Sequence, residues 1–170
     1  NKKIKIIATY FNNPIKINRK NLLVKKIDIN KDIKLIEKII KLYHPISLYY
    51  FATPRISINS VNKNIKKDYE KYFIKFPLDI IKKIKNEKCN FFYPSSTYVD
   101  SLKSNIYSRS KLMGENKLKK INKSNIKINI LRIKEVNTKQ NLSLLSKKLP
   151  NFRDLLFENH EYQGKLFFYE

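Results

Sequence analysis

Short apolar segments alternate along the chain with segments whose apolar residues recur every three or four positions. The first kind is rich in Ile, Val, Phe and Tyr and predicts β-strands, whereas the second predicts amphipathic helices. Strands are expected at residues 3–11, 21–29, 46–54, 89–97 and 126–133. Helices are expected at residues 30–44, 59–86 and 105–123. Alternating strands and helices favour a parallel sheet with helices on both faces, so the pattern predicts an α/β fold.

A few residues mark where these elements begin, end or break. Asn30 is a suitable N-cap for the helix over 30–44, and Pro45 ends that helix. Pro77 is expected to interrupt or kink the helical region that contains it. The segments over 46–54 and 89–97 are apolar without alternation, which is typical of strands buried on both faces.

The length of 170 residues suits a single domain over residues 1–170. The pattern is weaker over residues 138–170, which we interpret as a C-terminal extension with a helix near 149–159 and a short strand at 164–170. The chain has no initiator methionine, and its single Met is Met113. We therefore expect it to be a fragment or a trimmed form of a longer protein.

The formal net charge of +23 raises the question of a nucleic-acid partner, because clustered lysines release counterions from phosphates. The lysines are scattered, however, and Arg occurs only five times. Lys, Asn and Ile are all frequent and share A/T-rich codons, which favours compositional drift and a solvated surface. Nucleic acid is thus not the expected partner. A basic nucleic-acid-binding protein stays open as an alternative, and clustering of the lysines on one face of the folded protein would favour it.

Cysteine and histidine are scarce, which narrows the chemistry. Cys89 is the lone cysteine, so an internal disulfide and a thiolate metal cluster are excluded, and a reducing cytoplasm is the expected location. His44 and His160 are too far apart in sequence to indicate a zinc site, so no metal is expected. No run of about 18 apolar residues is present, which argues against a membrane span.

The most informative pattern begins where the strand over 89–97 ends in hydroxyl residues, in the stretch FFYPSSTYVD. Tyr107 and Lys111 follow, one helical turn apart, and then the pair Gly-Glu and a strand that ends in Leu-Arg. In so lysine-rich a chain a Tyr-x-x-x-Lys spacing also arises by chance. A solvated pair on a helix, and a Ser96 hydroxyl that caps its own turn, are the structural alternatives to a functional site.

In their order, these segments resemble the extended short-chain dehydrogenase/reductase family, in its NAD-dependent epimerase/dehydratase branch. The resemblance covers about residues 3–137. It implies a Rossmann-like three-layer fold with a mainly parallel sheet, N-terminally truncated because the glycine-rich strand–helix unit is missing. We expect sequence upstream of Asn1 to encode a strand, a Gly-x-x-Gly-x-x-Gly motif or a close variant, and a helix.

The resemblance assigns catalytic roles to three residues. Tyr107 is implied as the group that passes the proton, and Lys111 as the ammonium that lowers the tyrosine pKa and holds the nicotinamide ribose. The residue implied to bind the substrate oxygen is Ser96, with Thr97 as a near competitor. We therefore expect a Ser-Tyr-Lys site.

The resemblance also implies where a dinucleotide binds. Asp28, with Ile29 beside it, corresponds to the family's adenine contact, and the small pair Ala52 and Thr53 lets the backbone approach the cofactor. The cofactor is NAD or NADP. After the strand over 3–11 no acidic residue is present to bind ribose hydroxyls and basic residues follow, which favours NADP.

The implied activity is that of an NAD(P)-dependent oxidoreductase, epimerase or dehydratase. Its substrate would be a nucleotide-sugar or a similar compound with a hydroxyl or carbonyl group. A homodimer is compatible with the resemblance. Two features depart from the family. Tyr72 or Phe73 replaces an Asn that normally faces the site, and only ten residues separate Ser96 from Tyr107. Both would suit the alternative of a catalytically inactive member that serves as a binding or scaffold subunit.

Overall fold

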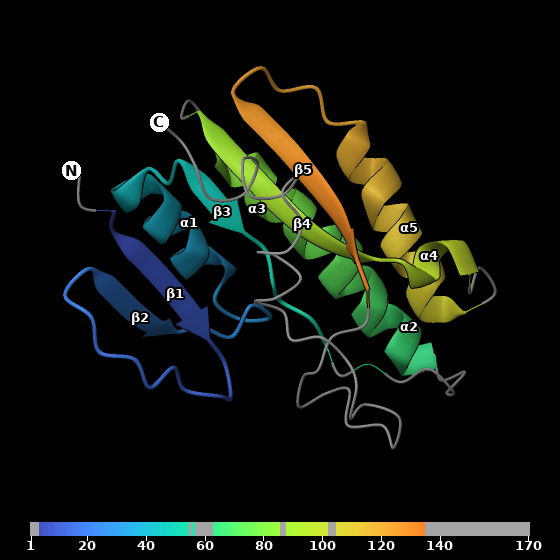
Figure 1. The fold of residues 1–170 in the computed structure, drawn as a ribbon, viewed down its shortest axis with the longest axis horizontal. Helices are drawn as coiled ribbons and strands as arrows, with labels where there is room; N and C mark the ends of the chain where they lie inside the picture. The colour runs from blue at the N-terminus through green and yellow to red at the C-terminus, as the bar shows by residue number, and fades with distance from the viewer. Residues whose placement is uncertain (1–3, 55, 57–62, 86–87, 102–104, 135–170) are drawn as a thin grey trace. The chain divides into compact units, whose positions relative to one another are not determined.

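A computed structural model describes residues 4–54, 56, 63–85, 88–101 and 105–134 of the chain (Figure 1). The chain divides into two compact units, residues 1–44 and 45–170, which we describe separately. The elements predicted near 149–159 and 164–170, within the proposed extension over 138–170, lie outside the described residues. Among the helices of the described part, none has the length and hydropathy needed to cross a membrane.

The first unit contains two parallel strands and one helix. Strands β1 (Ile6–Tyr10) and β2 (Leu22–Lys26) pair in register from Ile6↔Leu22 to Tyr10↔Lys26. Helix α1 (Ile33–Tyr43) follows and buries Ile40. It ends at His44, which adopts a left-handed conformation (φ 44°), and Pro45 cannot continue the helix.

The start of α1 differs from the expectation that Asn30 is its N-cap. The helix begins after Asp32, and Asn30 donates its backbone N–H to Asp28 Oδ1 at 2.9 Å. Asp28 thus closes a turn through its side chain, as aspartate commonly does. The turn lies between the end of β2 and the helix, and the helix is shorter at its N-terminus than its apolar pattern indicated.

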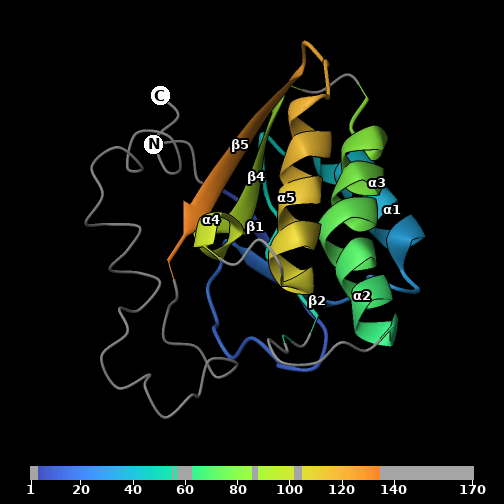
Figure 2. The ribbon, with the colours of Figure 1, turned by 90° about the vertical axis from the view of Figure 1, so that its right-hand side faces the viewer.

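The second unit is built on a three-stranded parallel sheet. Strand β4 (Cys89–Ser96) lies between β3 (Ser47–Tyr49) and β5 (Ile126–Ile133). Strands β4 and β5 pair over all eight positions, from Cys89↔Ile126 to Ser96↔Ile133. Figure 2 shows α5 (Ile106–Lys119) side by side with the helical segment that contains α2 (Lys63–Glu70) and α3 (Phe76–Lys83), along this sheet. The prediction of an α/β fold with parallel strands is confirmed.

The segments over 46–54 and 89–97 were both predicted to be strands buried on both faces, and the structure confirms this for only one of them. Strand β4 is buried on both faces, as its apolar run predicted, with Phe91, Phe92 and Tyr93 all in the core. Strand β3 is shorter than the apolar run over 46–54, and Tyr49 and Phe51 are 40% and 51% exposed. The expectation that this second run is buried on both faces is therefore wrong.

The helical region predicted over 59–86 is described from residue 63 onward as α2 (Lys63–Glu70), the π-helical turn η1 (Lys71–Lys75) and α3 (Phe76–Lys83). The Phe76 N–H bonds to the Lys71 carbonyl, five residues earlier, which widens the helix at η1. The irregularity predicted at Pro77 lies in the turn directly before it. Pro77 itself occupies the first turn of α3, where a missing N–H is best tolerated.

Two tyrosines, Tyr93 of β4 and Tyr50 directly after β3, bond to the backbone of η1. In an α-helix the Phe73 carbonyl would accept a hydrogen bond from the N–H of residue 77, and in a π-helix the Tyr72 carbonyl would do so. Residue 77 is a proline and has no N–H, so neither bond can form. Instead, Tyr93 Oη donates to the Phe73 carbonyl at 3.0 Å, and Tyr50 Oη donates to the Tyr72 carbonyl at 2.7 Å. Burial raises the pKa of both tyrosines, so both hydroxyls keep the proton that they donate. These two hydroxyls thus provide the hydrogen bonds that Pro77 cannot provide to the carbonyls of η1.

Candidate functional site

The predicted catalytic residues come from the carboxyl end of β4 and the first two turns of α5. Strand β4 ends at Ser96, whose Oγ accepts a hydrogen bond from the Tyr98 N–H at 3.2 Å. Helix α5 begins after Asn105, whose Oδ1 accepts from the Tyr107 N–H at 2.7 Å. This N-cap fixes the start of the helix and so sets the direction in which Tyr107 and Lys111 leave it.

The Ser96 side chain acts on the Tyr107 hydroxyl and lowers its pKa, so these two predicted residues are neighbours. The Tyr107 ring also stands nearly perpendicular to the rings of Tyr69 and Phe73, at centroid distances of 5.8 and 5.4 Å. Burial raises the pKa of Tyr107, the Ser96 side chain opposes this, and Tyr69 adds to the rise. The pKa of Tyr107 is therefore raised overall, and a lowering contribution from Lys111 stays a prediction.

Lys111 is 7% exposed, and its ammonium lies within the protein rather than on a solvated helix face. Its Nζ donates to the Pro94 carbonyl at 2.6 Å. The same atom lies over two aromatic rings, 4.3 Å from the centroid of Phe73 and 5.0 Å from that of Tyr93. Burial lowers the pKa of Lys111 to about 7, against an opposing effect of the Glu115 carboxylate. Its charge can therefore change near neutral pH.

The other predicted residues lie at strand ends. Ala52 and Thr53 follow β3, and Thr53 Oγ1 donates to the Pro54 carbonyl at 3.2 Å. Thr97, the competitor of Ser96, donates its backbone N–H to the Ile133 carbonyl at 3.2 Å. Because β3 and β4 are parallel, Ala52, Thr53 and Ser96 belong to the same carboxyl edge of the sheet.

Asp28 and Ile29 follow β2 and belong to the first unit. The Asp28 carboxylate accepts both the backbone N–H and the side-chain amide of Asn30, at 2.9 and 3.2 Å. The groups it contacts are thus those of a turn. The adenine contact implied for Asp28 and Ile29 stays a prediction.

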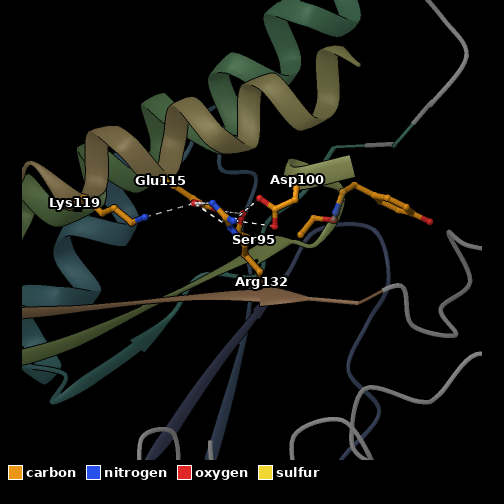
Figure 3. A network of polar contacts seen from close by, with 7 residues as sticks. Ser95, Asp100, Glu115, Lys119 and Arg132 are labelled. Atoms are coloured by element: carbon orange, nitrogen blue, oxygen red, sulfur yellow. Dashed lines mark hydrogen bonds and ion pairs between the residues drawn. The ribbon is translucent and has the colours of Figure 1, made fainter. Parts of the chain in front are cut away.

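A buried carboxylate that the sequence did not assign to the site joins α5 to the sheet (Figure 3). Glu115 is 1% exposed and accepts from Ser95 Oγ at 2.5 Å. Arg132 of β5 donates to the same carboxylate through Nη2 and Nε, at 2.7 and 3.0 Å. Arg132 also donates to Asp100 at 2.7 Å, and Lys119 Nζ lies 3.8 Å from Glu115 Oε2. The Gly-Glu and Leu-Arg pairs in the sequence were the signals from which this network could have been predicted.

The charges of this network stabilise one another. Burial works against the charged form of Glu115, but the hydrogen bonds from Arg132 and Ser95 and the charges of Arg132 and Lys119 hold its pKa below the ordinary value. The bond to Glu115 in turn raises the pKa of Arg132, with a further contribution from Asp100. The network connects α5 with β4, β5 and α4 (Tyr98–Ser101), and so fixes the helix that carries Tyr107 and Lys111.

Gly114 allows α5 to approach η1 closely. A Cβ atom at this position would lie 2.3 Å from the Phe73 carbonyl oxygen and 2.8 Å from Tyr93 Oη. Both distances are shorter than any real contact, and the first is to backbone. The close approach is what places Phe73 beside both Tyr107 and Lys111.

No protein-family model matches the chain, and no curated protein sequence does. Solved structures do resemble it. A short chain dehydrogenase from Salmonella enterica serovar Typhi has a TM-score of 0.65 at 13% identity, over 81% of this chain and 67% of its own. The FolM alternative dihydrofolate reductase 1 of Brucella suis, in complex with NADP, has a TM-score of 0.59 at 14% identity, over 69% and 56%.

A third similar structure is the UDP-glucose 4-epimerase of Brucella ovis in complex with NAD, with a TM-score of 0.53 at 16% identity, over 66% of this chain and 38% of its own. The chain thus spans between 38% and 67% of the length of these three proteins. At such low identity the likeness establishes the fold. The described part of the chain has the Rossmann-like α/β fold of short-chain dehydrogenases.

Proposed function

We propose that this chain forms part of an NAD(P)-dependent oxidoreductase, epimerase or dehydratase of the short-chain dehydrogenase type. The observation that carries the proposal is the buried Lys111 ammonium, which donates to the Pro94 carbonyl near the carboxyl end of β4 and shares the ring of Phe73 with Tyr107. Ligands of parallel α/β sheets bind beyond the carboxyl ends of the strands, which is where these side chains lie. Pairs of titratable groups with shifted pKa values in such a place favour a functional site.

The residues present fit a nicotinamide dinucleotide. The Lys111 ammonium has three donors and makes one hydrogen bond, to Pro94, among the described residues, so donors remain for ribose hydroxyls. Ala52 and Thr53 are small residues at the same sheet edge as Ser96. The adenine contact that the resemblance implies for Asp28 and Ile29 is a separate prediction about the first unit. The cofactor, NAD or NADP, would supply hydride transfer when bound. Similar structures with NADP and with NAD support this choice.

The protein groups would then handle the proton. Ser96 and Tyr107 would both hydrogen-bond to a substrate oxygen, and Tyr107 would give or take the proton as that oxygen becomes a hydroxyl or a carbonyl. Because burial favours the neutral phenol, Tyr107 suits the role of proton donor. A nucleotide-sugar is the substrate class that we favour, since one similar structure is a UDP-glucose 4-epimerase.

The test is a comparison of variants in cofactor binding and turnover. Tyr107→Phe should keep the binding of NADH or NADPH, measured by cofactor fluorescence, and should lower turnover about 10²- to 10⁴-fold on a panel of nucleotide-sugars and related alcohols. Lys111→Ala should weaken both. Lys117→Ala is the matched control, because Lys117 is an exposed lysine of the same helix, and it should change neither. Turnover of Tyr107→Phe at the parent rate would contradict the proposal.

A binding or scaffold subunit without catalysis is the second candidate. It is favoured by the burial of Lys111 against the Pro94 carbonyl, and by the presence of Tyr72 or Phe73 where the resemblance places an Asn. A parent chain that binds a dinucleotide but turns over no member of the panel would favour this candidate.

A further inference from the structure

One aromatic ring contacts both groups on which the proposed chemistry depends. The Phe73 ring lies 5.4 Å from the Tyr107 ring, centroid to centroid, at an angle of 85°. The Lys111 Nζ lies over the same ring, 4.3 Å from its centroid. Phe73 is thus a side chain that contacts both the tyrosine ring and the lysine ammonium.

Phe73 is held in place from several sides. Its side chain is fully buried, and its ring packs against that of Tyr69 at 5.5 Å. Its carbonyl accepts the Tyr93 hydroxyl, and Gly114 of α5 leaves room for that carbonyl. A ring with these constraints cannot turn away from the ammonium without breaking the contacts of η1.

The Lys111 ammonium depends on its surroundings, because burial disfavours its charge. The titratable groups around it are Glu115 of its own helix, Tyr93 of β4, whose ring also lies beneath it, and Tyr107, which shares the contact with Phe73. From η1 the neighbour is the uncharged ring of Phe73. A cation over an aromatic face is attracted by the ring quadrupole, and the attraction is strongest where water is excluded.

We propose that Phe73 is a positioning residue of this site, whose ring holds the charged Lys111 side chain and fixes the Tyr107 ring beside it. Its relevance to catalysis rests on the proposed function, whereas its action on Lys111 is a property of the folded chain alone. In this view the aromatic residue does not impair the site by replacing an amide. It provides a different way of holding the same lysine.

The electronic character of the ring can be changed with little change in its size. Phenylalanine with one, two and five ring fluorines, incorporated at position 73 of the full chain, weakens the quadrupole stepwise and with five fluorines reverses it. The pKa of Lys111 is measured from the ¹³Cε shift of labelled lysine, as the resonance that titrates near neutrality and is missing from Lys111→Arg. Its pKa should fall stepwise, by about one unit over the series. Phe73→Leu is less suitable because it also opens a cavity.

The matched control is the same fluorinated series at Phe91, which is equally buried and whose ring packs 6.2 Å from that of Tyr50. This series should leave the pKa of Lys111 unchanged. An unchanged pKa in the Phe73 series, or an equal fall in the Phe91 series, would overturn the proposal. The measurement needs neither cofactor nor substrate, so a parent chain without dinucleotide binding would contradict the proposed function while the Phe73 series still gives its own answer.

Discussion

Gly114 lies in the middle of α5, where alanine is ordinarily the more stabilising residue by about 1 kcal/mol. In this helix, however, the added Cβ atom would lie 2.3 Å from the Phe73 carbonyl oxygen and 2.8 Å from Tyr93 Oη. The tyrosine could move aside only by releasing its hydrogen bond, and the carbonyl could move only with η1. Gly114→Ala should therefore destabilise the protein.

The magnitude follows from three contributions. Overpacking of a well-packed interior costs about 1–3 kcal/mol. Loss of the Tyr93 bond leaves the Phe73 carbonyl unsatisfied, which costs about 1–3 kcal/mol more. The helix propensity of alanine returns about 1 kcal/mol. We expect a net loss of about 3 kcal/mol in the free energy of unfolding.

Urea denaturation followed by far-ultraviolet circular dichroism measures this loss. The control is Asn116→Ala, two residues further along α5 and exposed to solvent, where the gain in helix propensity should appear without a clash. The control should be as stable as the parent or slightly more stable. If Gly114→Ala were also as stable as the parent, the close approach of α5 to η1 would be refuted.

Two further predictions concern buried charges. Burial lowers the pKa of Lys111 to about 7 from 10.5, so between these values the unfolded chain holds a proton that the folded chain has released. The free energy of unfolding should therefore rise from pH 7 to pH 9, by up to about 1.4 kcal/mol per pH unit, and equal slopes in the parent and in Lys111→Met would contradict this. The pKa of Glu115 is lowered on folding, so its charge stabilises the fold above its unfolded pKa, and this contribution is lost as the pH falls through the folded value. Glu115→Gln should cost about 2 kcal/mol at pH 7 in urea titrations, and a cost that did not shrink in acid would contradict the role of the charge.

The sequence predicted the sheet better than the site. The run over 126–133, in which apolar and polar residues largely alternate, coincides with β5, and the apolar run over 89–97 coincides with the buried strand β4 to within one residue. The apolar run over 46–54 corresponds to a much shorter strand, Ser47–Tyr49. Tyr49 and Phe51 count as apolar in the pattern although both are partly exposed to solvent. A pattern of residue types does not distinguish these two outcomes.

The sequence suggested candidate residues for the site but not the directions in which their pKa values are shifted. The spacing of Tyr107 and Lys111 indicated a shared helix, and the hydroxyl run indicated Ser96 as a partner. The directions of the pKa shifts depend on burial, which is set by residues distant in sequence. The bond from Tyr93 to Phe73, for example, spans 20 positions and left no sign in either segment. The resemblance therefore named these groups as candidates, but the sequence did not reveal the environment that determines their charge.

The tyrosine bonds to η1 make the energies of distant positions depend on one another. Pro77 has no N–H to donate to the Phe73 carbonyl, and the Tyr93 hydroxyl of β4 donates to it instead. If residue 77 had an N–H, the helix could bond that carbonyl itself, and loss of the Tyr93 hydroxyl would cost less. The two positions are thermodynamically coupled, so the effect of changing both is not the sum of the separate effects. A helix-breaking residue thus makes the attachment of this helix to the sheet more specific, because the helix needs a donor that only the sheet provides.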